Sequence, residues 1–235
     1  MNGARSHLNG RLILAGGGDR GDSRPADELF ARWIGAGARL LYWPIAMPPE
    51  LKRFGQCLGW LRESFEPLGV TSITMWTDLS GKTVADFAGF DALYLGGGCT
   101  YWLLSEIRKH GFGGIVTDFA RSGGPIYGGS AGAIVLGRDI ATCAHMDRNL
   151  SNLTDTAGLN LVNGFGVACH YRPQHDPTLS TCARQIGAPV LAMTERGSIV
   201  MEGGQLRAAG FEASYVFTGD ARVPIPVGEL VAASA

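Results

Sequence analysis

The sequence lacks the features that mark nucleic-acid-binding, secreted and membrane proteins. Its 20 basic and 21 acidic residues leave a formal net charge of −1, so it has no basic excess for nucleic acid or an anionic membrane surface. Its first apolar run covers only residues 12–15, which is too short for a signal sequence or a membrane span. We therefore expect a cytoplasmic protein with no nucleic-acid or membrane partner.

The cysteines also lack the spacing that disulfide frameworks and zinc sites need. There are five of them, an odd number, and no two are spaced as C-x-x-C. We expect reduced thiols and no metal site. The cysteines are Cys57, Cys99, Cys143, Cys169 and Cys182.

Composition and length favour one packed domain. Apolar residues make up 46% of the 235 residues, which is enough for a core, and charged residues make up only 17%. We find no repeat, low-complexity tract or interdomain linker. The prediction is a single domain over residues 1–235, whose oligomeric state, homo-oligomer included, the sequence leaves open.

Strand and helix patterns alternate through the first half of the chain. Strands are predicted at 11–15, 40–43, 70–76 and 92–95, and helices at 25–36, 51–68, 100–110 and 115–122. This order predicts an α/β fold with a mostly parallel sheet and helices on both faces. Glycine clusters 16–18, 96–98 and 128–129 follow strands, so we expect them at one edge of that sheet.

The second half of the chain has a different pattern. Residues 139–163 form a long, irregular excursion, after which a strand at 167–169 and a helix at 177–186 are predicted. Further strands are predicted at 190–193, 198–201, 206–209 and 214–217. Because short turns join these strands, the C-terminal part is predicted to be antiparallel.

One stretch matches a catalytic motif in full. Residues 128–132 read G-x-S-x-G, with an apolar strand at 125–127 before them and a helical stretch at 131–136 after them. Strand, tight turn and helix are the context of a nucleophile elbow, which would present the Ser130 hydroxyl beside a helix N-terminus. The alternative is a glycine-rich turn whose serine only caps a helix.

A serine nucleophile needs a base and a carboxylate to orient that base. His170 directly follows a predicted strand and is our first choice as the base, ahead of His145 and His175. Glu195 ends the strand at 190–194 and is the first choice as the carboxylate, with Asp147 second.

Four segments resemble peptidase E (aspartyl dipeptidase) and its cyanophycinase relatives. They are Tyr94–Thr100, Gly129–Ala133, His170–Tyr171 and Thr194–Glu195. The resemblance implies a fold similar to class I glutamine amidotransferases, a Ser-His-Glu triad of Ser130, His170 and Glu195, and a short peptide as substrate. It also implies an oxyanion hole from the N–H groups of Ala131 and Gly97 or Gly98, and no metal or organic cofactor.

The sequence departs from peptidase E at positions that shape its pocket. Cys99 stands where that family usually has asparagine, Gly129 stands where it has tryptophan, and the segment after His170 is shorter. The resemblance therefore supports the hydrolytic machinery more than a preference for N-terminal aspartate. Cys99, Gly129 and Arg172 are the candidate substrate-binding residues, and Arg172 or Arg184 offers a bidentate contact to an acidic side chain.

Other functions compete with hydrolysis. Residues 16–21 match G-x-G-x-x-G, which predicts a nucleotide-binding Rossmann-like module. Two features count against it: the strand at 40–43 is followed by no acidic residue, and the helix is expected to begin only at Pro25. A non-catalytic protein of the same fold and a thiol hydrolase acting through Cys99 are the remaining alternatives.

Overall fold

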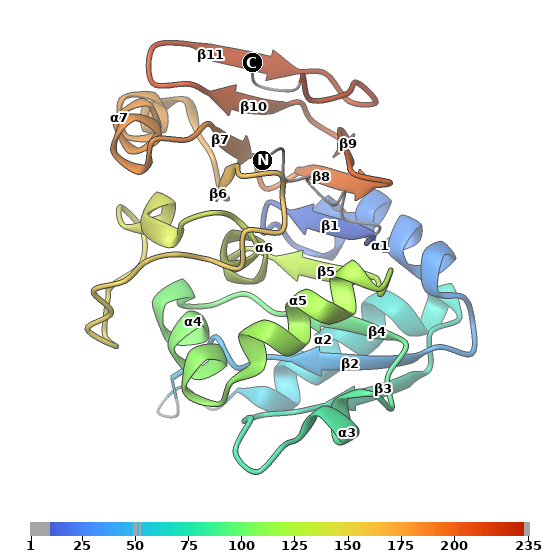
Figure 1. Ribbon diagram of the computed structural model, residues 1–235. Helices are drawn as coiled ribbons and strands as arrows, with labels where there is room; N and C mark the ends of the chain where they lie inside the picture. The colour runs from blue at the N-terminus through green and yellow to red at the C-terminus, as the bar shows by residue number, and fades with distance from the viewer. Residues whose placement is uncertain (1–9, 49–50, 52, 233–235) are drawn as a thin grey trace, which may run out of the picture.

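A seven-stranded sheet forms the centre of the computed structural model, which describes residues 10–48, 51 and 53–232 (Figure 1). The strand order is β3-β2-β4-β5-β1-β8-β9. Five parallel strands come first: β1 (Leu12–Ala15), β2 (Arg39–Trp43), β3 (Ser72–Met75), β4 (Ala92–Leu95) and β5 (Ile126–Gly129). The strands β8 (Gly197–Glu202) and β9 (Gln205–Gly210) extend the sheet in antiparallel fashion.

Helices cover both faces of this sheet, because the side chains on each face of its strands are apolar and buried. In β1, Leu12 and Leu14 enter one core and Ile13 enters the other, as the two-residue period of a strand requires. The helices α1 (Arg20–Ile34) and α2 (Phe54–Phe65) pack on the Ile13 side. The opposite face carries α4 (Thr100–Lys109), α5 (Phe112–Arg121) and α6 (Ala131–Leu136).

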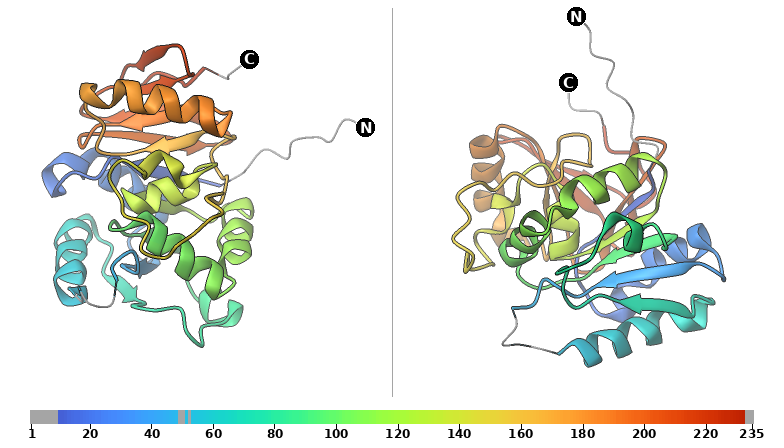
Figure 2. Two further views of the ribbon diagram at one scale, coloured as in Figure 1. Left: turned by 90° about the vertical axis from the view of Figure 1, so that its left-hand side faces the viewer. Right: turned by 60° about the horizontal axis from the view of Figure 1, so that its bottom comes forward.

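A smaller sheet lies beside the first one. Its order is β11-β10-β7-β6, with β6 (Gly166–Ala168) parallel to β7 (Val190–Met193). The strands β10 (Ser214–Phe217) and β11 (Arg222–Ile225) are antiparallel. Figure 2 shows α7 (Asp176–Ile186) lying across this sheet. Leu191 and Met193 of β7 belong to the same core as Leu12, so the two sheets share buried contacts.

The predicted α/β class, with a mostly parallel sheet, helices on both faces and antiparallel C-terminal strands, is confirmed. Among the described residues, no helix combines the length and the apolar character needed to cross a membrane. All five cysteines fall within the described ranges and are free thiols.

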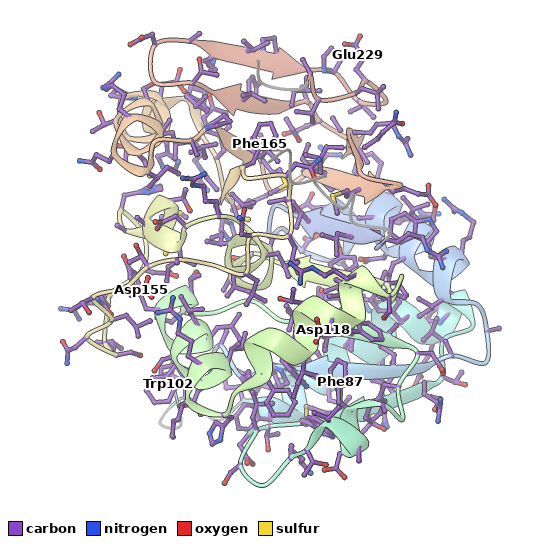
Figure 3. All side chains as sticks on the ribbon, in the orientation of Figure 1. Phe87, Trp102, Asp118, Asp155, Phe165 and Glu229 are labelled. Atoms are coloured by element: carbon purple, nitrogen blue, oxygen red, sulfur yellow. The ribbon has the colours of Figure 1, made fainter. Side chains whose placement is uncertain are left out.

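Several predicted boundaries were wrong. The first helix begins at Arg20 instead of Pro25, because Asp19 and Asp22 form a capping box that we overlooked. The predicted helix 51–68 ends in a 3₁₀ turn at Glu66–Leu68, and its residue 52 lies outside the described residues, as do the ends 1–9 and 233–235 of the predicted domain. A short helix, α3 (Val84–Phe87), and β11 were not predicted; Figure 3 labels Phe87, which enters the core.

A carboxyl group is buried beneath the sheet, on α1. Asp27 is 3% exposed and accepts hydrogen bonds from Tyr127 Oη (2.7 Å) and Ser23 Oγ (2.9 Å). Burial raises the pKa of Asp27 to about 6, since desolvation disfavours the carboxylate by more than these two hydrogen bonds favour it.

Asp27 makes the stability of the fold depend on pH. A carboxyl group whose pKa is raised by folding stabilises the protein below its unfolded pKa, and that contribution is lost as the pH rises through the folded value. Compared with Asp27→Asn, the wild type should lose about 2 kcal/mol of unfolding free energy between pH 4 and pH 7. Urea unfolding of both proteins across this range measures it. If the unfolding free energies of the two proteins changed equally with pH, the raised pKa assigned to Asp27 would be wrong.

Candidate active site

Ser130 lies in a tight turn between β5 and α6. Its backbone has φ 50° and ψ −112°, a conformation that non-glycine residues adopt at a cost. The glycines on either side make the turn feasible. A Cβ on Gly128 would lie 2.5 Å from the Gly132 carbonyl oxygen, and one on Gly132 would lie 2.1 Å from the Leu95 carbonyl oxygen. The turn therefore has the geometry that the elbow motif predicts.

His170 comes from the second sheet and reaches the Ser130 hydroxyl. It follows β6 with φ 52°, and its backbone N–H donates to the Gly16 carbonyl (2.9 Å). Its Nε2 lies 2.9 Å from Ser130 Oγ. The imidazole covers the loop after β1 so closely that a Cβ on Gly17 would lie 2.5 Å from it.

Glu195 lies on the far side of the same imidazole. It follows β7, and its Oε1 is 3.2 Å from His170 Nδ1. The guanidinium Nη2 of Arg172 lies 3.7 Å from the same oxygen. A carboxylate here accepts a hydrogen bond from Nδ1–H, which leaves the lone pair of Nε2 free to accept a hydrogen bond from the serine hydroxyl. The three side chains thus form a continuous chain of hydrogen bonds.

Backbone donors adjoin the serine hydroxyl. A Cβ on Gly97 would lie 3.3 Å from Ser130 Cβ, which places the loop after β4 against the elbow. The N–H groups of Gly97, Gly98 and Ala131 have no hydrogen-bond acceptor among the described residues. Free N–H groups in this position can bind a developing oxyanion.

Glycine clusters from two strand ends therefore meet at Ser130. A Cβ on Gly17 would lie 3.0 Å from Ser130 Cβ, and the Gly97 loop approaches from the other side. The expectation that these clusters share one edge of the sheet is confirmed. Their role was only partly foreseen, because the loop at 16–18 lies against His170 and Glu195 as well as against the elbow.

Asp147, the second choice for the carboxylate, is bound elsewhere. Its Oδ2 accepts a hydrogen bond from the backbone N–H of Thr100 (2.7 Å), at the N-terminus of α4. The Asp147 carboxylate thus binds one of the free N–H groups at the start of α4. The N-cap residue, Cys99, makes no side-chain hydrogen bond to them. We find no hydrogen bond between Asp147 and His170 in the described part of the chain.

The other candidate residues lie around the triad or away from it. The Cys99 Sγ lies 3.4 Å from the Arg148 carbonyl oxygen, and burial raises the pKa of its thiol, which disfavours the nucleophilic thiolate. Gly129 ends β5 immediately before the serine. The rings of His145 and His175 contact each other, with centroids 4.9 Å apart, and His175 Nδ1 accepts from the Arg172 N–H.

The nucleotide-binding alternative does not fit this topology. In a dinucleotide-binding fold the first strand adjoins the second, whereas β1 lies between β5 and β8. The helix does follow the glycine loop directly, so that part of our argument against the motif was wrong. The loop is nevertheless covered by the His170 imidazole at Gly17 and by Glu195 at Gly18.

Comparison with known proteins gives a consistent result. The sequence model of peptidase family S51 matches residues 12–209. An uncharacterized peptidase of Listeria monocytogenes is 31% identical over 114 residues, which is 47% of this chain and 55% of the relative. Peptidase E of Shewanella sp. (strain ANA-3) is 29% identical over 149 residues, 59% of this chain and 62% of the relative. The matched stretch thus spans less than two thirds of these curated relatives.

Solved structures share the fold at lower identity. A putative peptidase E protein from Listeria monocytogenes EGD-e superimposes with a TM-score of 0.68 at 20% identity, covering 86% of this chain and 99% of the other. A peptidase from an acI-B1 Actinobacterium gives a TM-score of 0.71 at 18% identity, covering 96% and 98%.

Proposed function

The chain belongs to peptidase family S51, and on that premise we propose that it is a serine-type peptidase that hydrolyses short peptides. Ser130 is the nucleophile, His170 the general base and Glu195 the residue that orients the imidazole. The observation that carries the proposal is the unbroken path from Ser130 Oγ to His170 Nε2 (2.9 Å) and from Nδ1 to Glu195 Oε1 (3.2 Å).

The reaction proceeds through an acyl-enzyme. Ser130 Oγ attacks the carbonyl carbon of a peptide bond while His170 Nε2 takes the hydroxyl proton. The N–H groups of Ala131 and Gly97 or Gly98 stabilise the oxyanion. The C–N bond then breaks as the imidazolium returns its proton to the leaving amine. Water, deprotonated by the same imidazole, hydrolyses the ester and releases the acid.

Glu195 acts through the imidazole. Its carboxylate fixes the tautomer with the proton on Nδ1 and stabilises the imidazolium that forms during attack. The side chain is 44% exposed, so water competes for this carboxylate more than it does in a buried triad. The Arg172 guanidinium lies 3.7 Å from the same carboxylate oxygen and forms an ion pair with it.

Covalent labelling tests the function and separates it from the alternatives. A fluorophosphonate reacts with a serine only where a base activates it, so we expect a single adduct on Ser130, located by peptide mass spectrometry. The rate at which the protein hydrolyses a panel of dipeptides should fall in proportion to the fraction of Ser130 that is labelled. An adduct on Cys99 would favour the thiol hydrolase, and an unlabelled, inactive protein would favour a binding role.

A further inference from the structure

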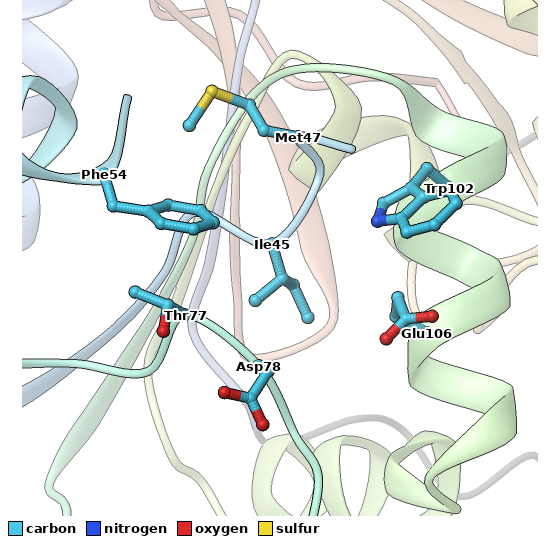
Figure 4. Close-up of a pocket in the computed structure, with 7 residues that line it drawn as sticks. All are labelled: Ile45, Met47, Phe54, Thr77, Asp78, Trp102 and Glu106. Carbon is cyan, nitrogen blue, oxygen red and sulfur yellow. The ribbon is translucent and has the colours of Figure 1, made fainter. Parts of the chain in front are cut away.

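A pocket separate from the triad opens at the same edge of the large sheet. It has a volume of about 420 Å³ and is lined by Ile45, Met47, Phe54, Thr77, Asp78, Trp102 and Glu106 (Figure 4). Its walls are mostly apolar, with the rings of Phe54 and Trp102 on either side of the view. Among the described residues that line it, Asp78 and Glu106 carry the charge.

Backbone contacts connect this pocket to the nucleophile. The carbonyl oxygen of Ala46, between Ile45 and Met47, accepts the Cys99 N–H (2.9 Å), at the end of the glycine loop after β4. The other side of that loop contacts Ser130, through Gly97. The pocket is therefore one loop away from the serine hydroxyl, on the side opposite His170.

The position of His170 decides which part of a substrate faces the pocket. The imidazole must protonate the leaving amine, so the leaving residue lies on the His170 side of Ser130. The residue that supplies the attacked carbonyl then extends away from His170, over the exposed Gly97–Gly98 loop. Its side chain is the one that can enter the pocket.

The two carboxylates differ in their partners within the protein. Glu106 is only 16% exposed, and its carboxylate pairs with Lys109 Nζ of α4 (3.4 Å) and lies 3.5 Å from Nε2 of His110, the residue that caps this helix. Asp78 accepts a hydrogen bond from the Ser80 N–H and has no ion pair among the described residues. Trp102 lies one helical turn before Glu106, on the same face of α4, and offers a ring to a cation.

We propose that the pocket binds a basic side chain, arginine or lysine, of the residue whose carbonyl Ser130 attacks. The aliphatic stem packs on Ile45, Met47 and Phe54, and the cationic head lies between Asp78, Glu106 and the Trp102 ring. An acidic side chain would meet two like charges there. The assignment rests on the proposed peptidase function and gives it a substrate class.

Paired substrates test the charge alone. Citrulline has nearly the shape of arginine without its charge, so Arg-Leu and Cit-Leu differ only in the feature that the pocket is proposed to recognise. We expect kcat/KM for Arg-Leu to exceed that for Cit-Leu at least about tenfold, the ratio typical of one charge-assisted contact. Leu-Arg and Leu-Cit, with the charge on the leaving residue, should differ less than threefold, roughly the noise of such a comparison.

Variants locate the preference in the pocket. In Asp78→Asn/Glu106→Gln we expect the Arg-Leu to Cit-Leu ratio to fall below about 3, since the attraction to the cation is removed. Asp118→Asn is the matched control: it removes an exposed carboxylate from α5, where Figure 3 labels it, and should leave the ratio unchanged. Circular dichroism checks that each variant is folded.

The outcomes separate this inference from the function on which it rests. Rapid hydrolysis with equal rates for Arg-Leu and Cit-Leu, or a preference that survives the double substitution, would overturn the pocket assignment and leave the peptidase intact. If the wild type hydrolyses no peptide, calorimetric binding decides: tighter binding of Arg-Leu than Cit-Leu, lost in the double variant, sustains the pocket, and equal binding overturns it.

Discussion

A Ser130→Ala variant should hydrolyse short peptides roughly 10⁴-fold more slowly than the wild type, or worse, and should still fold. The substitution removes the only atom proposed to form the acyl-enzyme. It deletes one hydrogen bond, to His170 Nε2, at a half-buried position, so we expect the unfolding free energy to change by no more than about 1 kcal/mol. Steady-state kinetics and urea unfolding of the same preparations measure both effects.

The backbone at this position supplies an internal control. Ser130 has φ 50°, which glycine adopts without the steric cost that a Cβ brings. Ser130→Gly should therefore be as inactive as Ser130→Ala but about 1 kcal/mol more stable than it. Activity retained in either variant would remove Ser130 from the nucleophile role.

The orienting carboxylate should show a smaller effect in the same assay. Glu195→Gln is expected to lower kcat about a hundredfold, less than in buried triads because this side chain is 44% exposed. Asp147→Asn removes a charge but keeps an oxygen that accepts the Thr100 N–H, so it should alter kcat only a few-fold. If Asp147→Asn lowered kcat more than Glu195→Gln did, Asp147 would be the orienting residue.

A Gly132→Ala variant should be destabilised by at least about 3 kcal/mol or fail to fold. The new Cβ would lie 2.1 Å from the carbonyl oxygen of Leu95, and a backbone atom cannot turn aside as a flexible side chain can. Relief requires α6 to move away from the end of β4, which also displaces the oxyanion loop. Thermal unfolding and soluble yield measure the loss.

Gly59→Ala is the matched control for that substitution. Gly59 lies within α2, and a Cβ there would meet nothing within 4 Å. Alanine in an open helical position should stabilise the protein by up to about 1 kcal/mol. If both variants lost stability equally, the close approach of Gly132 to β4 would not explain the second glycine of the motif.

The sequence allowed the main elements to be predicted where their patterns are local. The strand at 190–193 and the helix at 131–136 match the structure because each is an apolar run with clear limits, Pro189 and Thr194 for the strand and Ser130 and Gly137 for the helix. The start of α1 was placed wrongly because proline was given more weight than the Asp19–Asp22 capping pair, and a proline within the first turns costs few helical hydrogen bonds.

The site was predictable in its residue types but not in all its contacts. Ser130, His170 and Glu195 each follow a strand, and they meet because the ends of β6 and β7 of the small sheet lie against the end of β5 in the large one. The strand pattern could not place Asp147, which lies in an irregular segment and binds the N-terminus of α4. Nor could it show the pocket beside Trp102, because its walls come from three separate loops and helices.

The proposed nucleophile and its proton relay stand on different sheets. Ser130 follows β5 of the large sheet, whereas His170 and Glu195 follow β6 and β7 of the small one. Ser130 is therefore synthesised before the two residues proposed to activate it, and those residues reach it only through the packing of one sheet on the other. In the proposed mechanism, hydrolysis therefore requires the small sheet to have docked on the large one.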